Sequence, residues 1–159
     1  AALGAGLFSY RQLRRSFYIW FIQQVGLAEM ALLADGFWES LWADWSPGYD
    51  PADDITELRR HVTTDTIAGV INPYRASFNP EFADPGVADE AAAALSPPPV
   101  STLYLHGATD GAIGAELLGD VETHLPAAGS AFRLVDGVGH FLHLEKPEEV
   151  AGLIRDWLG

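Results

Sequence analysis

The sequence contains no cysteine. This absence excludes disulfide bonds, a thiolate nucleophile and cysteine-based zinc sites. It is also consistent with a cytoplasmic protein, because disulfide frameworks are typical of oxidising compartments, and we expect a cytoplasmic location.

Long apolar runs are missing as well. The longest apolar stretch, residues 16–34, is interrupted by Gln23, Gln24 and Glu29, whereas a membrane-spanning helix needs about 18 or more consecutive apolar residues. A secretory signal peptide has a basic segment ahead of an apolar run. The first residues of the sequence carry no such basic segment. We therefore expect neither a transmembrane segment nor a secretory signal.

Basic residues are scarce, with nine Lys and Arg residues against 22 Asp and Glu residues, and the formal net charge is −13. Like-charge repulsion on this scale argues against nucleic acid and anionic membrane surfaces as partners. The one short basic cluster in the sequence consists of Arg11, Arg14 and Arg15.

The sequence has the length of about one globular domain, with 159 residues, of which 48% are hydrophobic. Aromatic residues are dense between Phe8 and Trp45, which predicts a region of aromatic packing or an aromatic-lined cavity. From residue 10 to about residue 95, apolar residues recur at steps of three and four. This periodicity predicts a mostly helical segment.

One of the expected helices covers residues 65–78, with Thr64 as its N-cap. Pro73 has no backbone N–H with which to reach the carbonyl of Gly69. We therefore expect Pro73 to bend this helix just before Tyr74.

Three consecutive prolines at residues 97–99 predict an extended linker after the helical segment. We expect a helical domain over residues 1–99, with the Pro-rich linker at its end, and a second part over residues 100–159.

The pattern changes after the linker to strand, helix, strand and helix, at residues 100–106, 114–125, 130–135 and 147–158. This order predicts an α/β fold that contains a βαβα unit of a parallel sheet. Parallel sheets are buried on both faces and rarely consist of two strands, so we expect this sheet to be incomplete. The sequence is therefore interpreted as the C-terminal portion of a larger protein, or as a chain that needs a partner chain.

Asp110 and His140 are the candidate catalytic residues, because each follows one of the predicted strands. Reactive groups of open parallel sheets gather beyond the carboxyl ends of the strands, so both side chains are expected at the same edge. A carboxylate beside an imidazole fixes the ring tautomer, while the other ring nitrogen activates a water or a nucleophile. The alternative interpretation is structural, because Asp-Gly is a common turn pair and loop histidines often serve as hydrogen-bonding residues.

His140, His143 and Glu145 form an H-x-x-H-x-E string, which is a conceivable metal site. No helix is predicted across these residues to align the ligands, and no further His or Cys cluster completes a site, so we expect no metal and no cofactor. His143 and Glu145 are interpreted as structural, with Glu145 stabilised by the dipole of the last helix. No nucleophile is recognisable, because no serine or aspartate stands in the G-x-S-x-G frame.

Four segments resemble parts of one known superfamily. The segments "STLYLHGATDGAI" and "GVGHFLHLEKPEEV", followed by "IRDWL", resemble the last third of an α/β-hydrolase from the branch of epoxide hydrolases and haloalkane dehalogenases. The segments "SFYIWFIQQVGLAE" and "INPYRASF" resemble parts of the helical lid that this branch inserts between two core strands. The resemblance implies that residues 1–99 are the lid and that residues 100–159 are the C-terminal part of the core.

The resemblance also implies roles for four residues. Asp110 is then the acid and His140 the base, while Tyr18 and Tyr74 are lid phenols that donate hydrogen bonds to the epoxide oxygen. In this family an aspartate attacks the epoxide carbon, and the activated water hydrolyses the resulting ester. That aspartate lies upstream of the lid, outside this chain. The implied substrate is a small apolar epoxide, ester or organohalide, and no cofactor is implied.

Several alternatives stay open. A haloalkane or haloacid dehalogenase has the same acid and base but uses halide-binding donors in place of the two phenols, and an esterase of the same fold uses a serine nucleophile. A third alternative is a non-catalytic fragment that docks onto a partner chain. The chain could also form a homodimer. On sequence alone, Tyr18 and the tryptophans are equally well interpreted as core residues.

Overall fold

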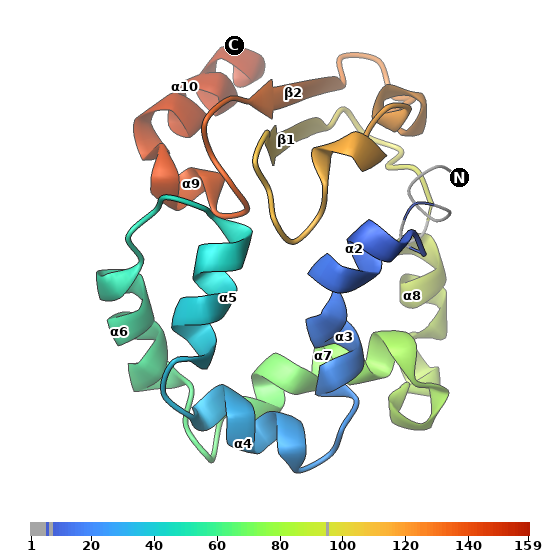
Figure 1. Cartoon of the computed structure of the whole chain (residues 1–159). Helices are drawn as coiled ribbons and strands as arrows, with labels where there is room; N and C mark the ends of the chain where they lie inside the picture. Colours follow the sequence, from blue (N-terminus) through green and yellow to red (C-terminus); the bar gives the residue numbers. More distant parts are fainter. Residues whose placement is uncertain (1–5, 7, 95) are drawn as a thin grey trace.

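The structure is a computed structural model that describes residues 6, 8–94 and 96–159 (Figure 1). The described part of the chain is mostly helical and contains a two-stranded parallel sheet, so its content is mixed α and β. The elements before the sheet are α2 (Tyr10–Arg15), α3 (Phe17–Ile22), α4 (Leu27–Leu33), α5 (Phe37–Trp45), α6 (Ala52–His61), α7 (Ile67–Phe78), η1 (Pro80–Phe82), η2 (Pro85–Val87) and α8 (Ala88–Ala94). The remaining elements are β1 (Leu103–Gly107), η3 (Ala115–Leu117), η4 (Val121–His124), β2 (Ala131–Val135), α9 (Leu142–Glu145) and α10 (Pro147–Leu158).

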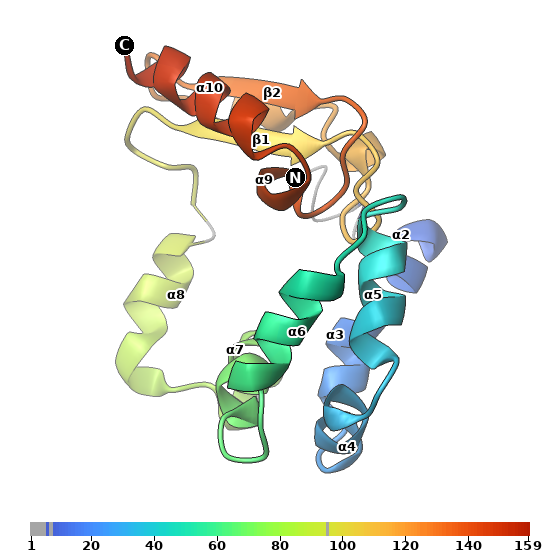
Figure 2. The same cartoon turned by 90° about the vertical axis from the view of Figure 1, so that its left-hand side faces the viewer.

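The sheet and the last two helices form one end of the molecule, and helices α2 to α7 form the other (Figures 1 and 2). Two helices of the larger end reach the loop that follows β1. The backbone of this loop is hydrogen-bonded to the last residue of α5 and to the Gln12 side chain of α2. The two ends of the molecule therefore meet at the C-terminal end of strand β1.

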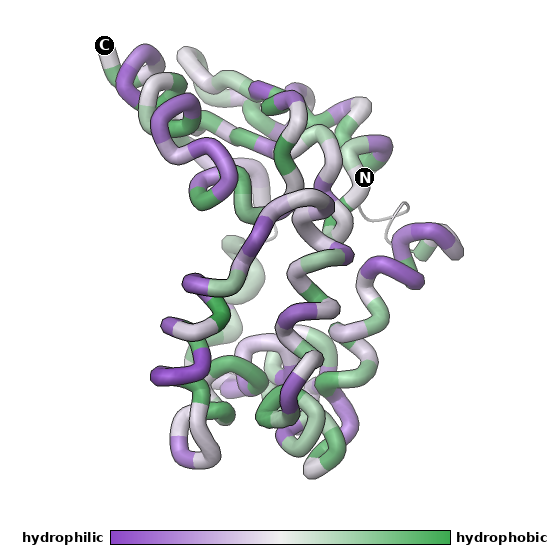
Figure 3. Tube along the Cα trace, turned by 60° about the vertical axis from the view of Figure 1, so that its left-hand side comes forward, coloured by the Kyte–Doolittle hydropathy of each residue, from purple (hydrophilic) through white to green (hydrophobic). Residues whose placement is uncertain are grey.

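The core of the helical end is rich in aromatic residues, as the sequence predicts. Helix α5 buries Trp38, Leu41, Trp42 and Trp45, which recur at steps of three and four. They belong to one buried cluster with Ile71 of α7. Hydrophobic and hydrophilic residues alternate along these helices (Figure 3), as expected of helices that cover a core with one face.

Arg75 of α7 is a buried charge that joins three helices. Its Nε donates to the carbonyl of Ile22 at 3.0 Å, and its terminal nitrogens donate to the Glu29 carboxylate at 2.7 and 3.2 Å. The hydrogen bonds from Arg75 lower the pKa of Glu29 to about 2. Glu29 also accepts the N–H of Gly26, so the same ion pair fixes the start of α4.

Helix α7 differs from the prediction at its start. It begins after Thr66, so the expected cap at Thr64 is wrong. Pro73 lies inside a helix that continues as one element from residue 67 to residue 78. The buried side chains of Ile71 and Arg75 lie on either side of Pro73, and their contacts hold the helix together although the proline removes one backbone hydrogen bond.

Strands β1 and β2 pair in parallel, with Leu103 opposite Ala131 at the start of the ladder. The α-helix predicted between them at residues 114–125 is wrong, because this connection contains the short 3-10 helices η3 and η4 instead. Gly119 and Asp120 stand in the middle of the segment. Both residue types favour turns over helix interiors, which explains the difference.

The helix predicted at residues 147–158 is confirmed as α10, with Pro147 in its first turn. The missing N–H of Pro147 breaks no helical hydrogen bond there. The longest described helices, α7 and α10, have 12 residues each. Within the described ranges, no helix combines the length and the apolar character needed to cross a membrane.

Candidate active site

The structure brings Asp110 and His140 together at the edge where both strands end. Nδ1 of His140 lies 3.0 Å from Oδ2 of Asp110. The other carboxylate oxygen, Oδ1, accepts the backbone N–H groups of Ala112 and Ile113 at 2.7 and 2.8 Å. Asp110 is therefore held in one orientation, in which it presents a single oxygen to the imidazole.

The surroundings of Asp110 keep this carboxylate ionised. Burial on its own raises the pKa of Asp110, but the hydrogen bond from His140 and the N–H groups of Ala112 and Ile113 outweigh it. The pKa of Asp110 is therefore lower than its ordinary value. An ionised carboxylate only accepts hydrogen bonds, so Nδ1 of His140 carries the proton and Nε2 is left as the basic nitrogen.

His106 is a third member of this site that the sequence analysis missed. It is buried, and its Nε2 lies 3.1 Å from the carbonyl of Ile113 and 3.5 Å from Oδ2 of Asp110. Because a carbonyl only accepts, Nε2 carries the proton and Nδ1 accepts from the Tyr104 hydroxyl at 2.9 Å. The signal that could have revealed His106 is its place in strand β1, four residues before Asp110.

A backbone carbonyl at the end of α5 joins the loops of the two candidate residues. The carbonyl oxygen of Trp45 accepts the N–H of Gly111 and the N–H of His140, each at 3.0 Å. A Cβ added to Gly139 would lie 2.5 Å from this oxygen, and one added to Gly111 would lie 1.7 Å from the carbonyl oxygen of Asp44. Both positions therefore require glycine, because any side chain would push α5 away from the loops.

His143 and Glu145 do not join His140 in a metal site. Both carboxylate oxygens of Glu145 accept the N–H of Gly139, at 3.0 and 2.8 Å, and His143 is exposed on α9. Glu145 is the last residue of α9, and its carboxylate holds the loop before His140. The described residues contain no group of three or more side chains suited to a metal ion.

Tyr18 and Tyr74 lie side by side, with ring centroids 5.7 Å apart in an edge-to-face arrangement. Both line an apolar cavity of about 200 Å³ between α3, α5 and α7. The structure gives neither hydroxyl a hydrogen-bond partner among the described residues. Burial, followed by the nearby Tyr74 and the Asp110 charge, raises the pKa of Tyr18 to about 12, and burial also raises that of Tyr74.

His140 touches the walls of this cavity. Its ring packs edge-on against the rings of Trp45 and Phe141, with centroid distances of 5.0 and 5.1 Å. Both of these residues line the cavity. The side chain of His140 is 32% exposed, and no described residue is hydrogen-bonded to its Nε2. The arrangement therefore offers a basic nitrogen next to an apolar cavity that contains two protonated phenols.

Comparisons with models of protein families, with curated protein sequences and with solved structures find no match to this chain.

Proposed function

We propose that this chain is the lid and the C-terminal core segment of an epoxide-hydrolase-like α/β-hydrolase. The observation that supports this proposal is the hydrogen bond between Asp110 and His140 beside a cavity lined by Tyr18 and Tyr74. The nucleophile of the proposed reaction is an aspartate outside the 159 residues, because no residue of the sequence stands in a nucleophile turn.

The proposed reaction has two covalent steps. The external aspartate attacks an epoxide carbon, and the C–O bond of the ring breaks to leave an ester and an alkoxide, which takes up a proton from solvent to become a hydroxyl. Water then attacks the ester while Nε2 of His140 takes one of its protons. Asp110 stabilises the imidazolium through the 3.0 Å hydrogen bond to Nδ1. The acyl C–O bond of the ester then breaks, the imidazolium returns its proton to the departing oxygen, and the aspartate carboxylate is released with the diol.

The two tyrosines act in the first step of this scheme. A phenol with a raised pKa stays protonated at neutral pH, so Tyr18 and Tyr74 are available as hydrogen-bond donors. Two donors aimed at one oxygen stabilise the alkoxide as its charge develops. The aromatic walls of the cavity favour a small apolar substrate.

The proposal is tested with a protein that carries both this chain and the segment with the nucleophile. Styrene oxide is added to the His140→Gln variant, and the intact mass of the protein is followed by mass spectrometry. We expect a stable adduct with the mass of the epoxide and a loss of turnover of about 10²-fold or more, because ester hydrolysis lacks its base.

His143→Gln is the matched control, since His143 is an exposed histidine three residues along the chain. This variant is expected to turn over styrene oxide like the parent protein and to accumulate no adduct. Ordinary turnover by His140→Gln would rule out His140 as the base. Hydrolysis of p-nitrophenyl esters through an adduct on serine would instead identify the esterase.

A dehalogenase is the second candidate, and one observation favours it. Trp42 lines the same cavity, and its buried Nε1 has no hydrogen-bond partner among the described residues. An indole N–H in an apolar cavity is a suitable donor for a halide ion. Release of bromide from 1-bromobutane, measured beside styrene oxide turnover, separates the two candidates.

A further inference from the structure

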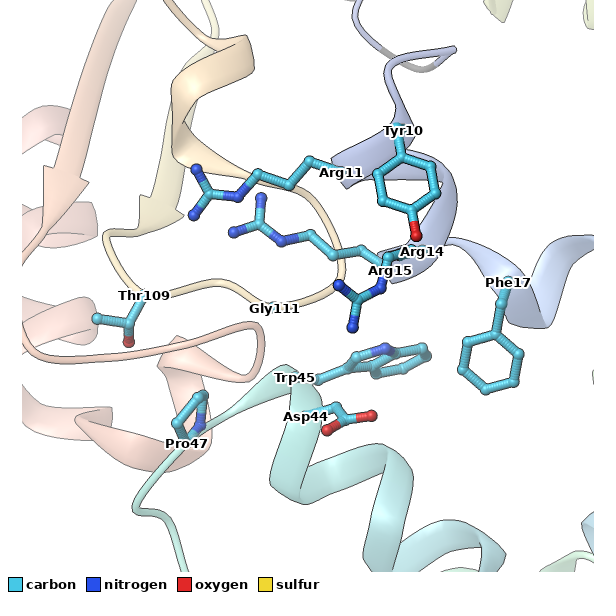
Figure 4. Close-up of a pocket in the computed structure, with 10 residues that line it drawn as sticks. All are labelled: Tyr10, Arg11, Arg14, Arg15, Phe17, Asp44, Trp45, Pro47, Thr109 and Gly111. Carbon is cyan, nitrogen blue, oxygen red and sulfur yellow. The ribbon is translucent and has the colours of Figure 1, made fainter.

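A second pocket, of about 630 Å³, lies between α2, the end of α5 and the loop after β1 (Figure 4). The side chains of Arg11, Arg14 and Arg15 extend from α2 into this pocket, and Trp45 and Thr109 contribute to its walls. The three arginines form the basic cluster seen in the sequence, and the proposed hydrolysis does not use them. The pocket therefore needs a separate explanation.

The pocket carries more positive charge than its acidic neighbours neutralise. Arg11 and Arg15 share a single carboxylate, that of Glu116, at 3.3 and 2.8 Å. Arg14 has no ion pair within the described part of the chain. Asp44 is the acidic residue in the lining. Arg14 is exposed, so its guanidinium is accessible to an anion from solvent.

A buried donor without a partner points to the same space. Trp45 is 9% exposed, and its Nε1 has no hydrogen-bond acceptor among the described residues. Figure 4 shows its indole below the arginine side chains, with the ring nitrogen on the side that faces them. Buried donors normally have partners, so the unpaired indole N–H of Trp45 indicates a missing acceptor on the side of the arginines.

The lining also indicates which kind of anion fits. Tyr10, Phe17 and Trp45 supply aromatic surface next to the guanidinium groups, which suits a ligand with a flat apolar body. Inorganic phosphate has no apolar body with which to contact these rings. A carboxylate on a flat apolar body therefore matches the lining of the pocket better than inorganic phosphate.

We propose that this pocket binds the carboxylate of a small aromatic or apolar organic acid. An arginine binds a carboxylate through two parallel N–H groups, and the indole N–H of Trp45 adds a third donor. The pocket adjoins the candidate site, because Thr109 precedes Asp110 and Trp45 packs against His140 at 5.0 Å. The role of the pocket in turnover rests on the proposed function, in which the bound carboxylate is one end of the substrate or product. The binding of a carboxylate does not depend on that function.

The test is a titration of the ¹⁵N-labelled 159-residue chain with sodium benzoate, followed through its indole N–H signals. Trp45→Phe removes one of the five indole signals and so assigns it. We expect the Trp45 signal to shift saturably, and Arg14→Gln to weaken the affinity about tenfold or more. No saturable shift up to about 10 mM benzoate, where even weak sites fill, would overturn the inference.

Arg60→Gln is the matched control, because it removes the same charge from an exposed surface of α6. It is expected to leave the benzoate affinity unchanged. An equal loss of affinity in Arg14→Gln and Arg60→Gln would show that only the overall charge of the protein matters, which would contradict a specific site. Benzyl alcohol and inorganic phosphate are the control ligands, and either one binding as tightly as benzoate would overturn a carboxylate site. Because no turnover is measured, this result and the His140→Gln result can fail independently.

Discussion

At the scale of single residues, Tyr18 shows most clearly how the fold changes a side chain. Burial, with smaller contributions from Tyr74 and the Asp110 charge, raises the pKa of Tyr18 to about 12. An unfolded tyrosine ionises near pH 10. The folded chain therefore favours the protonated phenol, and this preference stabilises the fold fully below about pH 10.

This preference predicts how stability changes in alkali. Between about pH 10 and 12 the unfolded Tyr18 ionises and the folded one does not, so the free energy of unfolding falls as the pH rises. Tyr18→Phe removes one titrating group, and we expect the fall to be shallower in this variant. Urea titrations at several pH values measure it. Tyr10→Phe, at an exposed ring, is the control, and an identical slope for Tyr18→Phe and the parent chain would contradict the prediction.

The candidate residues differ in how visible they are in the sequence. Asp110 and His140 could be found because each follows a strand, and the rule that parallel strands end at one edge brought them together. His106 was missed because a histidine inside an apolar strand reads as part of the sheet. The sequence could not reveal that Trp45 joins the loops of Gly111 and His140, because Trp45 does so through its backbone carbonyl oxygen, which every residue type carries.

At the scale of elements, the ion pair between Arg75 and Glu29 does most to position the tyrosines. It joins α7, which carries Tyr74, to α3 and α4. The Arg75 side chain is 6% exposed and that of Glu29 is 29% exposed. An ion pair of this kind is expensive to break from one side, because the remaining charge stays partly buried.

The Arg75→Met variant tests how much this ion pair contributes to stability. We expect a loss of about 2–3 kcal/mol in the free energy of unfolding, measured by urea titration, because Glu29 and the Ile22 carbonyl lose their donor. Arg60→Met is the control, since Arg60 and Glu57 form an exposed pair worth about 0.5 kcal/mol or less. Equal losses in the two variants would show that the burial of Arg75 has no energetic weight.

The elements themselves were predicted unevenly. Both strands exist close to their predicted positions, although β1 begins at Leu103 and not at residue 100, and α10 has its predicted bounds. Apolar β-branched runs and a Pro-led helix start are strong local signals. The helix expected at residues 114–125 is absent because Gly119 and Asp120 break its pattern. Pro73 lies inside α7, which continues as one helix on both sides of it.

At the scale of the whole molecule, the net charge of −13 opposes the compact state. Dissolved salt screens this repulsion, with a Debye length of about 10 Å at 0.1 M and about 3 Å at 1 M. We therefore expect the melting temperature at pH 7 to rise by a few degrees, on the order of 2–4 °C, as NaCl increases. Thermal unfolding followed by circular dichroism measures the change.

The same measurement near pH 4.5, the isoelectric point, is the control. The net charge is small there, so added NaCl is expected to change the melting temperature little. A melting temperature that falls with NaCl at pH 7 would show that ion pairs such as that of Arg59 with Asp35 and Glu39 outweigh the overall repulsion.

The Trp45 carbonyl has a consequence for the order of folding. It accepts N–H groups from two loops that lie far along the chain, at Gly111 and His140. Contacts between distant residues carry the largest loop-closure entropy and tend to form after local helices. The acid and the base are thus expected to meet only in the last phase of folding, after α5 has docked, so partly folded chains carry both residues without the site.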